Sequence, residues 1–313
     1  MRQQFHGELR VGTASRSRYG VRRRSSVLVR LGNGASSRLE GLDDVVSGVQ
    51  HSSMAHHAHR FLAFTREISP AIEHCELTHL ERTTINLERA RSEHAAYEAA
   101  LRGLGCEVRR LSAGNDMPDS VFIEDTAVVL DELAIITRPG AESRRAETPA
   151  VAEAVRRYRP VAAVLAPGTL DGGDVLLVDR RLIVGCGYRS NEAGIKQLRS
   201  VVASQGYDVE AATFTGCLHL KSAATLVADD LVLLNPAWID PGLFDPLRTI
   251  EVDPAEPYAA NALRVGDAII YPVEHARTLK RLEAAGLTIY PVPAGELAKA
   301  EGAVTCCSLL LAV

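Results

Sequence analysis

The feature of this sequence that most restricts its fold is a unit that recurs about every 45 residues. From about residue 59 onward, two strand-like runs are followed by a helix-like run and a further strand-like run. The unit is clearest in DVLLVDRRLIVGCG, SNEAGIKQLRSVVASQG and DVEAATF, which lie within residues 174–214. Repeats with periods of roughly 20–50 residues build closed or stacked arrays, so the sequence predicts an α/β fold of similar modules packed side by side.

Local signals indicate where the helices of these modules begin and end. Gly105 is placed to cap the C-terminus of the first helix, and Thr148 is expected at the N-cap of the second, with Pro149 at its first helical position. One stretch, DPGLFDPL (240–247), is irregular and short for a helical module. The helices expected from apolar spacing span residues 86–105, 148–158, 190–206 and 275–286.

Polar residues inside the apolar runs follow the period of the repeat. Five of them, near the starts of successive strand pairs, lie 47, 48, 42 and 45 positions apart: Glu124, Asp171, His219, Asn261 and Cys306. If the modules pack radially about an axis, these strand starts converge at one end of a central channel. Each residue alone fits an incidental polar group at the mouth of a strand, but the shared phase of all five favours one pocket.

A cysteine and a histidine at one pocket indicate nucleophilic catalysis, because a thiol nucleophile needs a lowered pKa or an adjacent base. A carboxylate behind the histidine would fix its tautomer and stabilise its charged form. The stretch LDGGDVL (170–176) suits this role, since its two glycines allow close backbone approach between Asp171 and Asp174. The same stretch also fits an Asp-Gly turn that leads into a hairpin.

The stretch MPDSVFIEDTAVV (117–129) places Asp119, Glu124 and Asp125 within seven residues. Glu124 and Asp125 are neighbours on an expected strand and should point to opposite faces, so at least one should face inward. A buried carboxylate needs a cationic partner, and a planar guanidinium fits best. Arginines that could bind a substrate carboxylate follow at positions 138, 144, 145 and 189. Together these groups describe a site for a zwitterionic amino acid with a cationic side chain, unless they are solvated at the surface.

Composition limits the possible classes of protein. Charged residues make up 24% and hydrophobic residues 46% of the 313, as in ordinary globular proteins, and no apolar run approaches the roughly 20 residues that span a bilayer. The net charge of −4 mixes both signs, so neither a nucleic acid nor a membrane surface is expected as a partner. The six cysteines include no C-x-x-C, which favours free thiols in a reducing, cytoplasmic compartment. A strained Cys306–Cys307 disulfide is not expected.

Residues 1–53 differ from the rest, being rich in Arg, Ser and Gly and poor in acids. We expect a disordered tail, or upstream sequence before a true start at Met54, rather than a targeting segment of the Arg- and Ser-rich type. The histidine cluster HHAHR (56–60) could chelate a metal, but a solvated chain end is the commoner case. Residues 59–313 are expected to form a single catalytic domain.

Six strings are similar to dimethylarginine dimethylaminohydrolases of the guanidine-modifying superfamily: PDSVFIEDTAVV, TRPGAESRR, LDGGDVL, GYRSN, LHLKS and AVTCCSLLL. The strings occur in order, and the resemblance runs from about residue 59 to the C-terminus. It implies a five-module α/β propeller with pseudo-five-fold symmetry around a central channel. It also implies hydrolysis of N-ω-methylated arginine to citrulline and a methylamine, without a cofactor or a metal, in a monomer or homodimer that acts on a small guanidino amino acid.

The resemblance also implies roles for individual residues. Cys306, two positions before Ser308, is the nucleophile, and Cys307 fills the variable position and faces the other side of an expected strand. His219 is the general acid and base, and Asp171 orients it. The residues implied in substrate binding are Glu124 and Asp125 for the guanidinium, Asp119 and the main chain near Ile68 for the α-amino group, and Arg144 and Arg189 for the α-carboxylate.

Four alternatives remain. The first is a related citrulline-forming hydrolase with altered specificity, for example for a monomethylated or another guanidino substrate. Arginine deiminases usually carry HLD at the histidine and an added helical domain, whereas this chain has HLK, with Lys221, and no room for that domain. A catalytically silent binding module would have no need for Cys306, His219 and Asp171 together. A zinc protein using Cys306 and His219 would need further ligands, since structural zinc sites have four. Incubation with dimethylarginine, scored for citrulline, separates an enzyme from a binding module.

Overall fold

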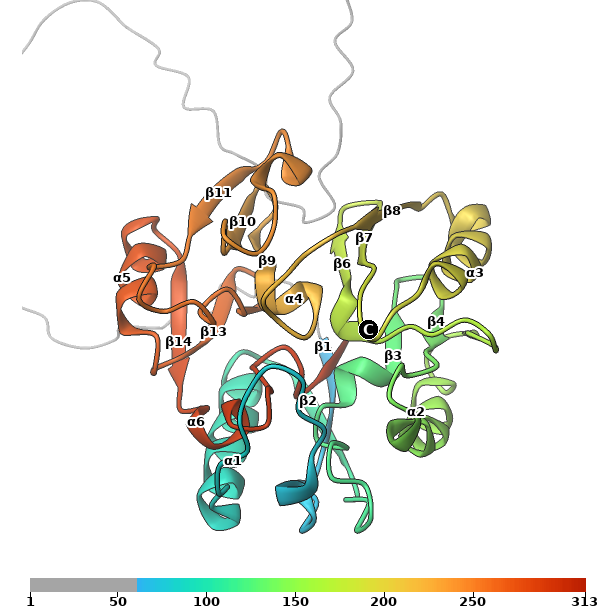
Figure 1. Ribbon diagram of the computed structural model, residues 1–313, viewed down its shortest axis with the longest axis horizontal. Helices are drawn as coiled ribbons and strands as arrows, with labels where there is room; N and C mark the ends of the chain where they lie inside the picture. The colour runs from blue at the N-terminus through green and yellow to red at the C-terminus, as the bar shows by residue number, and fades with distance from the viewer. Residues whose placement is uncertain (1–60) are drawn as a thin grey trace, which may run out of the picture. The chain divides into compact units, whose positions relative to one another are not determined.

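The structure, a computed structural model, describes residues 61–313, so the expectations for residues 1–53, Met54 and the histidine cluster lie outside the described residues. In the described range the chain forms five three-stranded sheets. Each has one antiparallel and one parallel pair about a middle strand, as the recurring sequence unit predicts. Figure 1 shows the sheets arranged around a common centre with the longer helices on the outside.

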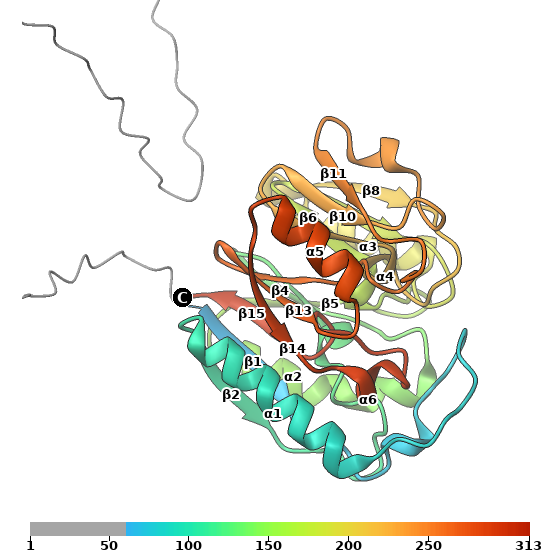
Figure 2. The same cartoon turned by 90° about the vertical axis from the view of Figure 1, so that its left-hand side faces the viewer.

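The first module joins the two ends of the described range. The C-terminal strand β15 pairs antiparallel with β1, and β2 pairs parallel with β1 after a crossover through helix α1. This pairing closes the ring, as Figure 2 shows from the side. The elements of the module are β1 (Phe61–Arg66), η1 (Ile72–His74), α1 (Leu87–Gly103), β2 (Glu107–Leu111) and β15 (Leu309–Ala312).

The remaining four modules follow in chain order. The second comprises η2 (Ile123–Thr126), β3 (Ala127–Val129), β4 (Ala134–Ile136), η3 (Glu142–Glu147), α2 (Thr148–Val155) and β5 (Val161–Ala163). The third comprises η4 (Gly172–Asp174), β6 (Val175–Val178), β7 (Arg181–Gly185), α3 (Glu192–Val202), η5 (Ala203–Gln205) and β8 (Asp208–Ala212). The fourth comprises α4 (Leu220–Ala223), β9 (Ala224–Ala228), β10 (Leu231–Leu234), η6 (Pro241–Phe244) and β11 (Arg248–Glu251). The fifth comprises β12 (Leu263–Val265), β13 (Ala268–Pro272), α5 (Ala276–Ala284), β14 (Thr288–Val292) and α6 (Gly295–Ala298).

The hydrophobic core has the same five-part organisation. Each of five clusters of buried apolar side chains draws on two neighbouring modules, for example Leu233 of β10 with Ile269 of β13, or Ile135 of β4 with Leu182 of β7. A module therefore buries its apolar surface against both neighbours and cannot do so alone, which is the physical basis of repeat architectures. The predicted α/β propeller is confirmed.

Helix ends follow the predicted signals with one exception. Asn86 caps α1 by accepting a hydrogen bond from the Arg89 N–H, and Gly105 has the expected positive φ of 84° after the helix. Thr148 is not an N-cap, because η3 runs directly into α2 and gives Thr148 helical dihedral angles. Its hydroxyl instead donates to the Arg145 carbonyl.

Within residues 61–313, none of the helices combines the length and the apolar character needed to cross a membrane.

The fourth module has only the single turn η6 where the other modules have a longer helix, and Phe244 at the end of that turn is fully buried. We expect Phe244→Ala to lower the free energy of unfolding by about 3–5 kcal/mol, because it leaves a cavity in the cluster shared by the third and fourth modules. Urea denaturation measures this. Leu177→Ala, at a partly exposed position on β6, is the control and should change stability by less than about 1 kcal/mol. Equal losses in the two variants would contradict this account of the core.

Candidate active site

Five turns, one before the first strand of each module, bring the in-phase polar residues to the centre of the ring. The positions are Glu124 within η2, Asp171 before η4, His219 before α4, Asn261 before β12 and Cys306 in the turn before β15. The expectation that these residues lie on strands is therefore wrong. Glu124 and Asp125 occupy a 3-10 turn and both are buried, so they do not alternate between two faces. Cys306 and Cys307 are also both buried within a turn.

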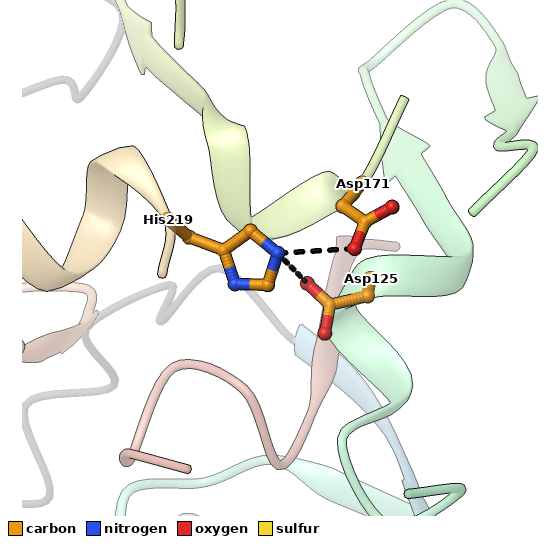
Figure 3. Close-up of side chains that lie close together, drawn as sticks. All are labelled: Asp125, Asp171 and His219. Atoms are coloured by element: carbon orange, nitrogen blue, oxygen red, sulfur yellow. Dashed lines mark hydrogen bonds and ion pairs between the residues drawn. The ribbon is translucent and has the colours of Figure 1, made fainter. Parts of the chain in front are cut away.

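His219 contacts two carboxylates at this centre, both through the same ring nitrogen (Figure 3). Its Nε2 lies 3.0 Å from Oδ2 of Asp171 and 3.8 Å from Oδ1 of Asp125. Oδ1 of Asp171 accepts a hydrogen bond from the Gly140 N–H at 2.8 Å, and Oδ1 of Asp125 accepts one from the Gly173 N–H at 3.0 Å. The imidazole is therefore held by acids from two modules, each fixed in turn by a backbone donor.

Gly173 makes this arrangement possible. A Cβ at this position would lie 2.9 Å from Cγ and Nδ1 of the His219 ring and 2.7 Å from Oδ1 of Asp125. At Gly172 a Cβ would lie 2.0 Å from the Glu124 carbonyl oxygen. The predicted need for close backbone approach in LDGGDVL is confirmed.

A row of alternating buried charges extends from this cluster. Nη1 of Arg144 donates to Oδ2 of Asp125 at 2.5 Å, and the same guanidinium pairs with Glu147 at 2.9 Å. The order is Glu147, Arg144, Asp125, His219 and Asp171. The two acids beside Arg144 contact different guanidinium nitrogens, whereas both acids beside His219 contact its Nε2. Isolated charges in such a place would be strongly unfavourable, whereas paired and hydrogen-bonded ones are tolerated.

These neighbours shift the pKa values. Burial alone lowers the pKa of His219, but Asp125, Asp174 and Asp171 outweigh it and raise the pKa to about 9. Burial alone would raise the pKa of Asp125, but the cations His219 and Arg144 and the Gly173 N–H lower it below its ordinary value. At neutral pH His219 is therefore an imidazolium between carboxylates and has a proton to donate.

Cys306 lies beside the acids rather than the base. The Glu124 N–H donates to the Cys306 carbonyl at 3.1 Å, and within the described residues no hydrogen bond joins the Cys306 thiol to His219. Burial raises the pKa of the Cys306 thiol, and the charges of Glu124 and Asp125 raise it further. The thiol is therefore neutral until a cation enters the site and offsets these carboxylates.

The remaining in-phase residue, Asn261, connects the fourth and fifth modules to the cysteine turn. It donates from Nδ2 to the Thr305 hydroxyl at 2.9 Å and accepts from the Thr305 N–H at 3.0 Å. The Thr305 hydroxyl donates to Oε2 of Glu124 at 2.7 Å, and Nζ of Lys221 lies 2.6 Å from Oε1 of the same carboxylate. Lys221 and Thr305 thus hold the Glu124 carboxylate in place. The sequence signal for these roles is their position two residues after His219 and one residue before Cys306.

The residues predicted to bind the α-amino and α-carboxylate groups of a substrate differ from one another in their surroundings. Asp119 is buried and accepts a hydrogen bond from the Glu76 N–H, and Arg189 is close enough to influence the pKa of Asp119. Nη1 of Arg189 is buried and has no hydrogen-bond partner among the described residues. Arg144 directs its N–H groups to Asp125, Glu147 and main-chain carbonyls. Ile68 lies in the core cluster of the first and fifth modules, and the main chain that meets Asp119 is that of Glu76.

A cavity of about 410 Å³ lies next to this centre. One wall is made by His79, Leu80, Glu81 and Thr83, and another by Cys217 and Leu218, the two residues before His219. A third wall is made by Glu301, Gly302 and Ala303, which lead to Cys306. Asn261 contributes to the same lining.

Comparison with known proteins identifies the family. Residues 63–240 match the family model described as "N,N dimethylarginine dimethylhydrolase, eukaryotic". An N(G),N(G)-dimethylarginine dimethylaminohydrolase from Streptomyces coelicolor is 41% identical over 251 residues, which cover 80% of this chain and 96% of that protein. The chain belongs to the dimethylarginine dimethylaminohydrolase family. It is therefore a hydrolase.

Further relatives and solved structures of the dimethylarginine dimethylaminohydrolase family agree. The Pseudomonas aeruginosa protein of that name is 33% identical over 223 residues, which cover 71% of this chain and 88% of that protein. A structure of a Cys-to-Ser variant of the Pseudomonas aeruginosa enzyme, complexed with citrulline, has a TM-score of 0.77 at 29% identity and covers 81% of this chain and 99% of that chain. The N-terminal domain of ArgZ, an arginine dihydrolase from cyanobacteria, has a TM-score of 0.69 at 20% identity, covers 80% of this chain and 98% of that chain, and shares the fold.

Three residues of the candidate site could also approach a metal ion. Ligand atoms of Asp125, Asp171 and His219 all lie within 4.8 Å of one another. Metal binding requires a neutral imidazole, whereas the surrounding acids raise the pKa of His219 to about 9. A metal would therefore have to displace a tightly held proton.

The close contact at Gly173 can be tested without substrate. In Gly173→Ala the new Cβ displaces the His219 ring from Asp171 and Asp125, so we expect the pKa of His219 to fall from about 9 toward its ordinary value of about 6.5. An NMR titration of the imidazole measures this. Gly103→Ala, at the last residue of α1 where a Cβ would meet nothing within 4 Å, is the control. An unchanged His219 titration in Gly173→Ala would overturn the packing argument.

The raised pKa of Cys306 predicts how this protein responds to alkylating reagents. Below the pKa the thiolate fraction grows about tenfold per pH unit, so alkylation by iodoacetamide should still be accelerating at pH 9. The measurement is the rate of labelling of the peptide that holds Cys306, with Cys306→Ser to subtract labelling of Cys307. A rate that levels off near pH 7 would mean that the thiol is already ionised in the free protein.

Proposed function

We propose that this protein hydrolyses N-ω-methylated arginine, including asymmetric dimethylarginine, to citrulline and methylamine or dimethylamine through a covalent intermediate on Cys306. The observation that carries the proposal is the contact of His219 Nε2 with Asp171 and Asp125, which raise the pKa of His219, together with the buried Cys306 beside Glu124 and Asp125. The family relatives support the substrate class, since they are named for dimethylarginine and one structure holds citrulline.

The guanidinium would lie beside Asp125 and Glu124. Burial raises the pKa of the Cys306 thiol in the free enzyme, and the charges of these two acids raise it further. A cationic guanidinium offsets this charge, so binding of substrate lowers the free-energy cost of forming the thiolate. The substrate itself would thus activate its nucleophile, and neutral ligands such as citrulline would not.

The amino-acid end would be held by Asp119 and Arg189. Asp119 provides a buried carboxylate for the α-ammonium group, and Arg189 has a buried N–H without a partner that can donate to the α-carboxylate. Arg144 is proposed to hold Asp125 in place rather than to bind the carboxylate, because its N–H groups are already used. Ile68 contributes packing of the first module, and the backbone next to Asp119 belongs to Glu76.

The chemical steps follow from the charges. Once the cation is bound, the Cys306 thiol releases its proton to solvent and the thiolate adds to the guanidinium carbon. His219 gives a proton to the departing amine, which leaves a thiouronium cation and a neutral imidazole. His219 then takes a proton from water, the hydroxide adds to the same carbon, and the sulfur leaves as thiolate with citrulline as product. Because Nε2 faces the two carboxylates, Nδ1 is the nitrogen that exchanges protons with the reaction. Acid–base assistance of this kind contributes about 10²–10⁴-fold to rates.

The test is a comparison of arginine with its monomethylated and asymmetric dimethylated forms, scored for citrulline and for the released amine. We expect citrulline and dimethylamine from the dimethylated form, and a loss of at least about 10⁴-fold in kcat for Cys306→Ser with an unchanged circular dichroism spectrum. Cys307→Ser is the matched control and should retain most of the activity.

Three results would contradict the proposal. Turnover of unmethylated arginine in preference to the methylated forms would favour a deiminase. Full activity in Cys306→Ser would exclude this nucleophile, and a trapped adduct on Cys307 would move the chemistry to the neighbouring residue.

A further inference from the structure

The loop between η1 and α1, residues 76–85, contacts the segment that leads to Cys306; we call it the covering loop. Oε1 of Glu301 accepts hydrogen bonds from three successive backbone N–H groups of this loop, those of Thr78 at 3.0 Å, of His79, and of Leu80 at 2.7 Å. In Figure 1 the loop lies beside the red segment after α6 that carries Glu301. One carboxylate oxygen therefore holds the tip of the covering loop.

The backbone of Glu301 is in a conformation that glutamate rarely adopts. Its φ is 57°, and in residues 61–313 only Asp179 shares a positive φ among the residues that are not glycine. The Glu301 N–H donates to the Ala298 carbonyl and the Gly302 N–H to the Leu297 carbonyl, so Glu301 occupies the left-handed position after helix α6 where glycine is preferred. A strained residue of this kind persists where its side chain has a use.

The covering loop also contacts the groups proposed for the amino-acid end of the substrate. The Glu76 N–H donates to both carboxylate oxygens of Asp119, at 3.2 and 3.1 Å, and the Ser143 hydroxyl donates to the Glu76 carboxylate at 2.6 Å. The His79 ring lies 5.7 Å from the ring of Tyr188, the residue before Arg189. The loop thus touches Asp119 at one end and Glu301 at its tip.

The same loop and the Glu301 segment both line the 410 Å³ cavity. Glu301 is five residues before Cys306, and the Ala303 carbonyl between them accepts the Cys306 N–H at 3.2 Å. The anchor of the loop and the turn of the proposed nucleophile are therefore one short segment.

We propose that Glu301 is a positioning residue: its carboxylate fixes the covering loop so that the Glu76 N–H orients Asp119 for the ammonium group of the substrate. The inference rests on the proposed function for its kinetic consequence, but the contact itself can be measured without activity. Loss of the carboxylate frees the loop and raises KM more than it lowers kcat, because the reacting groups around Cys306 and His219 are left in place.

The decisive variant is Glu301→Gly, because glycine relieves the left-handed backbone while removing the carboxylate. A merely structural residue would lose stability on substitution, whereas here we expect an unchanged or higher Tm. Amide exchange at residues 78–80 should become at least about tenfold faster. KM for the methylated arginine should rise about tenfold with kcat within about threefold of the wild type. Glu301→Gln, which keeps a carbonyl acceptor, should recover part of both effects.

Asp179→Gly is the matched control, since it removes an exposed acidic residue at the other left-handed position and should change neither exchange at residues 78–80 nor KM. Wild-type exchange rates in Glu301→Gly would overturn the proposal, and so would faster exchange with an unchanged KM. If Glu301→Gly fails to fold, amide exchange at residues 78–80 is measured in Glu301→Gln instead, and wild-type exchange rates in that variant would likewise overturn the proposal. Absence of citrulline formation in the wild type would refute the proposed function, while the exchange data would still decide whether Glu301 holds the loop.

Discussion

The structure depends on one row of alternating buried charges, in which Asp171 and Asp125 enclose the His219 imidazolium and Arg144 and Glu147 extend the row beyond Asp125. Removing one member leaves its neighbour uncompensated, which typically costs about 3–5 kcal/mol at a buried pair. The row holds three carboxylates and two cations, so its charge is net negative and a further cation would neutralise it. A protein built around this row binds a cationic ligand more easily than a neutral one of the same shape.

The five-fold repeat explains how such a row can assemble from distant residues. Each module begins its first strand after a tight turn, and closing the ring brings these turns together. Asp125 belongs to the second module, Asp171 to the third and His219 to the fourth, and the turn with Cys306 returns to the first. Because the second and third modules share one core cluster and the third and fourth share another, packing of these three modules brings the row of charges together. Pairing of β15 with β1 then adds the turn with Cys306.

Much of this arrangement could be predicted from the sequence, because the repeat of strand-like and helix-like runs can be recognised in this one sequence alone. The period predicts an array of similar modules, and the family resemblance predicts that it closes into a five-module ring. In such a ring the phase of Asp171, His219 and Cys306 predicts that they converge. The local backbone at these residues could not be predicted. Glu124 reads as part of a strand, yet it lies in a 3-10 turn closed by a long-range bond from its N–H to the Cys306 carbonyl.

Contacts that depend on distant parts of the chain were also missed. The hydrogen bonds of Glu301 join residues separated by more than 220 positions, and no local pattern marks that residue. Arg144 fits a substrate-binding arginine in sequence, but Glu147 on the next turn and Asp125 across the module use its N–H groups. The main chain beside Asp119 proved to be that of Glu76, because η1 turns the chain back between Ile68 and α1.

The most direct test of the account is a crystal structure of the Cys306→Ser variant with asymmetric dimethylarginine bound. The account predicts the guanidinium beside Asp125 with its central carbon about 3.5 Å from the residue 306 hydroxyl, a distance suited to attack, and the α-carboxylate on Arg189. A ligand bound elsewhere, or one in the reverse orientation with its carboxylate against His219, would contradict it.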